Sequence, residues 1–345
     1  MARNTMRKTR PRSSRKKPGL RVADEWIGGR ASMPAYVMEE GGFRPEIVLW
    51  LDATNDRIVG SELGKPGQPL DVVVNVLLAA MKKPMAGPPR EPSSIRVADP
   101  ALAERLREKL SSDIKIRVAP TFEFDRIIDL MSASFRRDDE EVSYLENGNV
   151  SAQTMGRFFK AAARLWRVAP WRVVDDSQLL QLDCPELEAR KKCISIIGNL
   201  GESYGVLVFD SVRDYQVMAE RGEALMAGDS PRDLGTGIFS INFDRGSDIP
   251  KAMRREVAKF GWEVPDASAY PRVQWADPDK LLRPLVDRDL VFATACTEAV
   301  AEFFAKHSTD IKEGEFRLAR EQLLLRDLPG QPTVELIAPH PEVEW

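Results

Sequence analysis

The sequence predicts two domains, an α/β domain with a mixed sheet followed by an α+β domain with antiparallel strands. Its 345 residues are enough to bury two cores. In residues 22–137, apolar strands alternate with amphipathic helices, as in a sheet that is covered by helices. In residues 151–345, short strands follow one another between helices, and the charge-dense stretch 138–150 is the expected linker.

The first domain is expected to have the order β-β-α-β-α-β-α, with residues 21–37 as an irregular lead-in that turns at Gly28 and Gly29. Two β-branched, apolar strands at 47–51 and 57–62 flank a turn of Ala, Thr, Asn and Asp. The remaining helices are predicted from apolar side chains at helical spacing and, in one case, from Asp and Pro at the helix start. The remaining strands are predicted from short apolar runs. The expected helices are 70–81, 101–110 and 122–135, and the expected strands are 95–98 and 114–118.

The second domain is expected to begin with an amphipathic helix at 152–167 and to end with an antiparallel strand pair at 315–325 and 333–337. Between them the pattern predicts strands at 178–182, 193–197, 206–209 and 238–243 and helices at 215–226, 250–260 and 278–306. Residues 261–277, which are rich in Pro and Trp, are expected to cross from the helix at 250–260 to the long helix.

Charge is distributed unevenly along the chain. Residues 1–21 hold nine Lys and Arg and no acid, whereas the rest of the chain holds 41 basic and 53 acidic residues. A basic arm can neutralise phosphates with salt-dependent affinity, so nucleic-acid binding is expected through Arg7, Lys8, Arg10, Arg12, Arg15, Lys16 and Lys17. The alternative is a disordered, solubilising tail.

Cysteine and histidine are too few and too scattered for the common catalytic sets. Cys184, Cys193 and Cys296 form no CxxC pair, which favours buried free thiols and a cytoplasmic protein over a disulfide framework. His307 and His340 have no partner at metal-ligand spacing, which disfavours zinc sites and Ser-His-Asp triads, and both are expected at the surface. No apolar run is long enough for a membrane span.

Acidic residues of the first domain form a candidate metal site. Asp52 ends one strand, Asp99 follows another, and Glu123 and Asp125 lie at the start of the last helix. If they converge, such acids can hold two Mg²⁺ or Mn²⁺ ions for phosphodiester hydrolysis. Asp99 is equally explained as a helix cap and Asp52 as a turn residue.

The segments "IVLWLDATNDRIVGSEL", "SSIRVADPALAERL" and "IKIRVAPTFEFDRIIDL" resemble an RNase H-like fold, as in the cores of integrases and DDE transposases. The resemblance covers about residues 45–136. It implies an RNase H-like strand order, with Asp52 and Asp99 as the first two metal-binding acids. Glu123 or Asp125 would be the third.

Two further motifs have both a binding and a structural interpretation. The segment "GNLGESYG" (198–205) has three glycines that could approach a phosphate, but it lies between two strands, where a hairpin turn explains them. The helix with Arg254 and Arg255, followed by Trp262 and Trp275, could bind a single nucleic-acid strand; alternatively it is an amphipathic helix with a solvated basic face.

The segments "APWRVVDDSQLLQLDCPE", "KKCISIIGNLGESYGVLVFDS" and "YPRVQWADPDKLLRPL", together with "DEWIGGRASMPAYV", resemble bacterial domains of unknown function. The resemblance implies a bacterial, cytoplasmic protein and no particular activity. Because the charge is uneven and no complete catalytic set is present outside the carboxylates, we expect an interaction protein with an unknown protein partner, associated with nucleic acid through its basic arm. One alternative is a metal-dependent nuclease or strand-transfer-like enzyme. The other is a small-ligand or peptide sensor with an apolar site near Trp171, Trp262 or Trp275.

Overall fold

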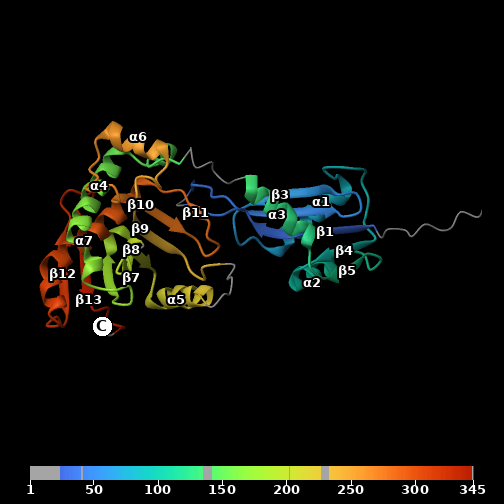
Figure 1. The fold of residues 1–345 in the computed structure, drawn as a ribbon. Coiled ribbons are helices and arrows are strands. Elements are labelled where there is room, and N and C mark those ends of the chain that lie inside the picture. Colours follow the sequence, from blue (N-terminus) through green and yellow to red (C-terminus); the bar gives the residue numbers. More distant parts are fainter. Residues whose placement is uncertain (1–23, 40–41, 135–141, 202, 227–232, 344) are drawn as a thin grey trace, which may run out of the picture. The chain divides into compact units, whose positions relative to one another are not determined.

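The computed structural model describes residues 24–39, 42–134, 142–201, 203–226, 233–343 and 345 (Figure 1). Backbone contacts divide the chain into two compact units. Unit 1 comprises Met1–Pro34 and Phe43–Ser134, and unit 2 comprises Ala35–Gly42 and Phe135–Trp345. Unit 1 is built on a mixed five-stranded sheet and unit 2 on an antiparallel eight-stranded sheet, so the chain is of mixed α/β type.

Unit 1 contains five strands and three helices in the described residues. They are β1 (Glu25–Ser32), β2 (Glu46–Asp52), β3 (Arg57–Gly64), α1 (Leu70–Lys82), β4 (Ser94–Val97), α2 (Pro100–Lys109), β5 (Lys115–Val118) and α3 (Phe122–Ser134). The predicted elements are present with small shifts at their ends, and β1 precedes them as an additional strand.

The additional strand β1 is the centre of the sheet, whose order is β3-β2-β1-β4-β5. It pairs antiparallel with β2 and parallel with β4. The expected turn at Gly28 and Gly29 is therefore wrong, because both residues lie within β1. Gly28 is opposite Trp50 of β2, and a Cβ on Gly28 would lie 2.3 Å from the Trp50 ring. Only glycine leaves room for this indole, which explains a glycine in the middle of a strand.

Helices cover both faces of the unit 1 sheet. Trp26, Val48 and Trp50 pack with α1 and α2 on one face, and Ile27 and Leu49 pack with α3 on the other. Successive side chains of a strand point to opposite faces, so strands buried on both sides read as continuous apolar runs. This accounts for the sequence of β2, whose last six residues are all buried.

Unit 2 begins with α4 and ends with an antiparallel strand pair. Its helices and strands are α4 (Ala152–Val168), β6 (Leu180–Cys184), β7 (Ala189–Ile197), β8 (Tyr204–Phe209), α5 (Val212–Met226), β9 (Ile238–Asp244), α6 (Lys251–Phe260), β10 (Tyr270–Ala276), β11 (Leu282–Arg283), α7 (Asp287–Lys312), β12 (Ala319–Leu324) and β13 (Thr333–Ala338). Short 3₁₀ turns are η3 (Glu146–Gly148), η4 (Pro170–Arg172) and η5 (Pro185–Leu187).

The unit 2 sheet has the order β11-β10-β9-β8-β7-β6-β13-β12. Side chains from one of its faces form the main core with α4, α6 and α7, and Figure 1 shows α4 and α7 running side by side. On the other face, Cys193 and Phe209 pack with Val212 and Tyr215 of α5. The three cysteines are free and buried, as expected.

The crossing expected at residues 261–277 contains a strand that the pattern did not predict, β10, which pairs with β9 along its whole length. Pro271 argued against a strand here, because proline has no backbone N–H to donate. On the β11 side, however, β10 is paired only at Trp275 and Ala276, so no strand there needs a hydrogen bond from position 271. The long helix begins at Asp287 instead of residue 278, because Pro284 disfavours a helix interior.

Residues 142–150, expected within the linker, pack into unit 2. Tyr144 and Val150 are buried in its main core. The hydroxyl of Ser143 and the backbone N–H of Tyr144 donate to the Glu256 carboxylate at 2.6 and 2.8 Å. Among the described residues, no helix is both long and apolar enough to cross a membrane.

Candidate functional site

Asp52 lies at the end of β2 and is 4% exposed. Its carboxylate accepts hydrogen bonds from the backbone N–H groups of Thr54 and Asn55, both at 3.2 Å, from the Asn55 amide at 2.7 Å, and from Arg90. Burial by itself would raise the pKa of Asp52, but the bonds from Asn55 and Arg90 outweigh it and lower this pKa. Arg90 also pairs with Asp24, and its guanidinium lies 5.3 Å from the centre of the Trp26 ring. The carboxylate is therefore occupied by the turn and by Arg90.

The other predicted acids have separate local roles. Asp99 is the N-cap of α2 and accepts from the Ala101 N–H at 2.8 Å. Glu123 pairs with Arg96 at 2.7 Å, and this hydrogen bond lowers the pKa of Glu123. Asp125 is exposed in the first turn of α3.

Sheet register separates Asp52 from Asp99. Asp52 is opposite Trp26, and Trp26 is opposite Ile95, the second residue of β4. Asp99 lies beyond the other end of β4, four residues from Ile95, or roughly 13 Å along the strand direction. The expected convergence of these two acids is therefore wrong. Among the described residues, no group of three His, Cys, Asp or Glu side chains is arranged to hold a metal ion.

The residues predicted to bind nucleic acid are described only in part. Arg7, Lys8, Arg10, Arg12, Arg15, Lys16 and Lys17 lie outside the described residues. Arg254 and Arg255 are exposed on α6, together with Lys251 and Lys259. None of these four α6 cations forms an ion pair with a described residue.

The tryptophans that follow α6 are packed within unit 2. Trp262 stacks on Phe159 at 5.0 Å between ring centres and on Phe260 at 5.1 Å. Trp275 meets the edge of Tyr36 and the guanidinium of Arg283. The interpretation of α6 as an amphipathic helix followed by a core Trp accounts for this packing.

A pocket with a volume of about 930 Å³ lies at Trp171 in unit 2. Four segments form it: the end of α4 with η4 and the loop that follows, the β7–β8 turn, the end of β9, and the loop before β10. Ala169 ends α4 with φ +53°, and this change of direction leads directly into η4, which contains Trp171.

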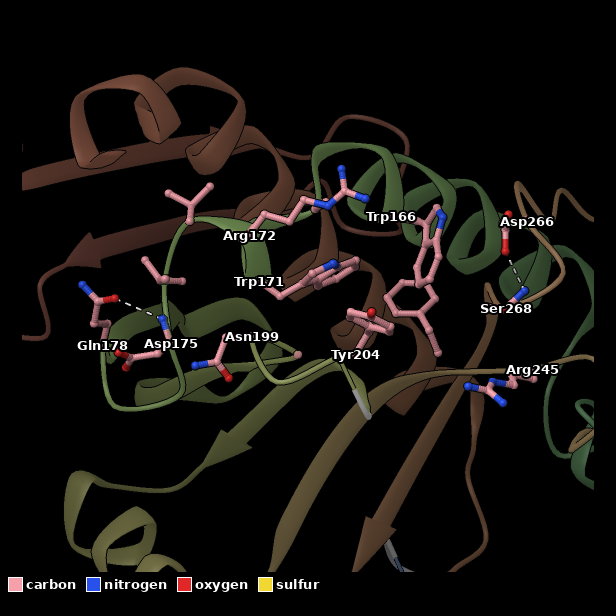
Figure 2. A pocket seen from close by; sticks show the side chains of 16 residues that line it. Trp166, Trp171, Arg172, Asp175, Gln178, Asn199, Tyr204, Arg245, Asp266 and Ser268 are labelled. Atoms are coloured by element: carbon pink, nitrogen blue, oxygen red, sulfur yellow. Dashed lines mark hydrogen bonds between the residues drawn. The ribbon is translucent and has the colours of Figure 1, made fainter. Parts of the chain in front are cut away.

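Four aromatic rings form the floor of the pocket. Trp171 lies 5.2 Å from Tyr204, 5.5 Å from Trp166 and 5.6 Å from Phe243 between ring centres, and Trp166 lies 5.2 Å from Phe243. Figure 2 shows Trp166, Trp171 and Tyr204 converging at the centre of the site. Tilted and edge-on arrangements at these distances are favourable for aromatic rings.

The β7–β8 turn is the segment that includes the three glycines. It joins antiparallel strands, in agreement with the hairpin interpretation. Gly198 has φ +132°, and a Cβ there would lie 2.6 Å from the Tyr204 ring and 2.9 Å from Trp171 Cβ. Glycine at 198 is thus required for the turn to approach the aromatic floor. The turn contributes Gly198, Asn199 and Gly201 to the pocket wall.

Polar side chains surround the aromatic floor. The described polar lining residues are Arg172, Asp175, Gln178, Asn199, Arg245, Asp266 and Ser268 (Figure 2). Sequence reasoning placed a site near Trp171 but did not find Trp166, Tyr204 or Phe243, which lie at unrelated positions in the sequence. The glycine-rich turn was the one local signal that pointed to them.

Comparison with known protein families gives a match over residues that include the whole unit 1 sheet. Residues 12–132 match the family model described as Domain of unknown function (DUF6930). The expected resemblance to domains of unknown function is confirmed for this part of the chain. No curated protein matches the sequence.

Proposed function

We propose that unit 2 is a binding module that recognises a small ligand or a peptide side chain in the pocket at Trp171. The observation behind this proposal is a concave site in which Trp166 and Tyr204 stay partly exposed above the buried rings of Trp171 and Phe243, beneath a polar rim. Ligand sites are typically concave, with volumes of about 300–1,000 Å³ and an aromatic lining with a few polar groups. Trp171 and Phe243 belong to the core, whereas Trp166 and Tyr204 remain partly accessible on the pocket side.

The test is a thermal-shift and ligand-detected NMR screen of the full chain against a library of small aromatic compounds and aromatic dipeptides. Asn199→Trp is the blocking variant, because Asn199 is an exposed turn residue in the pocket wall. Leu200→Trp is the matched control, because Leu200 is the next residue, is 85% exposed and does not line the pocket. We expect hits that Asn199→Trp abolishes and Leu200→Trp preserves. An absence of hits, or hits that both variants retain, would refute the proposal.

We propose as a second function that the chain binds nucleic acid through the basic arm and α6. The supporting observations are the nine cations of residues 1–21 and the exposed α6 cations without ion pairs to described residues. Removal of one cation that binds a phosphate should reduce the slope of log affinity against log salt by about one for a duplex.

The test is duplex binding at several salt concentrations, by the full chain and by Arg254→Gln/Arg255→Gln. Arg213→Gln/Arg288→Gln is the control of equal charge, because these exposed arginines pair with Glu220 and Glu188. A weaker salt dependence in the α6 variant alone would support the proposal, and equal binding by all three proteins would exclude a role for α6. A chain that starts at Leu20 tests the arm in the same way. Metal-dependent nuclease or strand-transfer activity, and the RNase H-like relationship of unit 1, stay predictions.

A further inference from the structure

The rim of the pocket holds two arginines that pair with no described residue. Arg172 follows Trp171 in η4, Arg245 follows β9, and both are exposed and line the pocket. Neither side chain forms an ion pair or hydrogen bond with a described residue. Figure 2 places Arg172 beside Trp171 and places Arg245 on the far side of Tyr204. The two guanidinium groups are therefore available on opposite sides of the aromatic floor.

The acidic residues of the rim, in contrast, are occupied by their own turns. Asp175 accepts from the backbone N–H of Ser177 at 2.9 Å and from its hydroxyl at 2.6 Å. Asp266 accepts from the backbone N–H of Ser268 at 2.8 Å. These bonds satisfy acceptor positions on both carboxylates, whereas neither guanidinium has an ion-pair or hydrogen-bond partner among the described residues. The pocket is thus better suited to an anion than to a cation, although aromatic faces alone would accept either a cation or a flat ring.

The aromatic side chains of the pocket floor favour a ligand with a planar ring. Aromatic side chains stack on planar rings, and base–aromatic stacking contributes about 1–3 kcal/mol per base. Arginine is suited to phosphate and carboxylate because its planar fork can donate two parallel hydrogen bonds. The Tyr204 hydroxyl also has no hydrogen-bond partner among the described residues, and Tyr204 lines the same pocket.

We infer that the pocket binds a planar aromatic ring that has a phosphate or carboxylate group, with dimensions close to those of a mononucleotide. The ring lies against Trp166 and Tyr204, the two partly exposed rings of the pocket, and the anion is held by Arg172, Arg245 or both. The Asn199 amide, at the tip of the turn, adds a polar contact. This inference rests on the proposed ligand-binding function and specifies the chemistry of its ligand.

The experiment measures dissociation constants of the full chain by calorimetry for two anionic probes, AMP and 2-naphthoate, and for their neutral counterparts, adenosine and 2-naphthamide. Inorganic phosphate tests the anion without a ring. We expect at least one anionic probe to bind tenfold or more tightly than its neutral counterpart, and phosphate alone to bind more weakly than that probe. Increasing salt should weaken the binding of the anionic probe.

Arg172→Gln/Arg245→Gln should reduce the affinity for the anionic probe to that for the neutral one. Arg190→Gln/Arg317→Gln is the matched control, because both residues are exposed, lie outside the pocket lining and have no ion pair with a described residue. The control should bind like the unmodified chain, and circular dichroism should show both variants folded.

Several results would overturn the inference. Equal affinity for anionic and neutral probes, or an arginine variant that binds like the control, would exclude the anion site. Phosphate that binds as tightly as AMP would exclude the ring site. Failure of both anionic probes would exclude the ligand class, and the Asn199→Trp screen would then decide independently whether the pocket binds another ligand or none.

Discussion

The guanidinium of Arg90 donates a hydrogen bond to the carboxylate of Asp52 and joins the loop after α1 to the turn between β2 and β3. Asp52 is 4% exposed, whereas a quarter of the Arg90 side chain remains accessible. The same guanidinium pairs with Asp24 and lies over Trp26. Arg90, Asp24 and Asp52 together therefore stabilise the start of β1. Asp52 thus has a structural role.

We predict that Asp52→Ala destabilises unit 1 by about 2–3 kcal/mol, less than the cost for a fully buried pair because Arg90 keeps Asp24 and some water. Asp99→Ala, which removes only a helix cap, should cost about 1 kcal/mol. Urea unfolding together with hydrogen exchange of β1 and β2 peptides would measure both. An Asp52→Ala variant that had normal stability but no longer showed Mn²⁺-dependent cleavage of nucleic acid would instead favour the metal site.

The Asp52 contribution should also depend on pH. Because the native pKa is lowered from its ordinary value of 3.8, the stabilisation is complete above that value and is lost as the pH falls through the lowered pKa. Asp52→Asn should remove this part of the acid sensitivity, as measured by urea midpoints between pH 5 and pH 2. An acid transition identical to that of the unmodified chain would contradict the assignment.

The contact between Gly28 and Trp50 predicts a large difference between adjacent glycines. Gly28→Ala places a Cβ inside the Trp50 ring contact and should destabilise unit 1 by about 3 kcal/mol, at the upper end for overpacking. Gly29→Ala meets no atom within 4 Å and should change stability by less than about 0.5 kcal/mol. Urea denaturation followed by tryptophan fluorescence would compare them. Similar destabilisation of the two variants would show that the indole is placed elsewhere.

Thiol labelling tests the buried cysteines. Burial raises the pKa of Cys184 to about 11 and the pKa of Cys193 and Cys296 to about 12. Since the thiolate is the reacting form, the folded chain should react very slowly with a disulfide reagent at pH 8, and all three thiols should react once urea is added. Rapid labelling of any one thiol in the folded chain would contradict this packing.

The burial of His340 predicts that the stability of unit 2 also depends on pH. Contrary to its expected surface position, it is 2% exposed, and its Nδ1 accepts from the Glu342 N–H at 3.2 Å. Burial lowers the pKa of His340 below its ordinary value of 6.5. The unfolded chain therefore binds more protons than the folded chain just below pH 6.5, and stability should fall as the pH decreases from 6.5 through the lowered pKa.

The variant that tests this is His340→Asn, whose amide oxygen can replace the Nδ1 acceptor without titrating. We expect a smaller decrease in the unfolding midpoint between pH 7 and pH 5 than in the unmodified chain. If both proteins show the same slope, protonation of His340 is not coupled to folding.

Local sequence patterns predicted most helices and strands, because alternation and helical spacing of apolar residues reflect which side of an element is buried. The prediction failed where tertiary contacts override local preference. Glycines usually interrupt a strand, but at β1 the Trp50 ring needs the space that Gly28 leaves. A proline usually argues against a strand, but the short β11 leaves the part of β10 around Pro271 unpaired on one side.

By itself, the sequence determined the mixed α/β character, the free cysteines and the uneven charge. Only the tertiary structure decided that Asp52 and Asp99 lie apart and that Trp166, Trp171, Tyr204 and Phe243 lie together. The physical reason is that strand order and register fix which distant residues meet, and a local pattern contains neither. Because β1 was not predicted, the sequence could not show where Asp52 and Asp99 lie relative to each other. The pocket could not be predicted either, because its lining comes from four segments that no sequence motif connects.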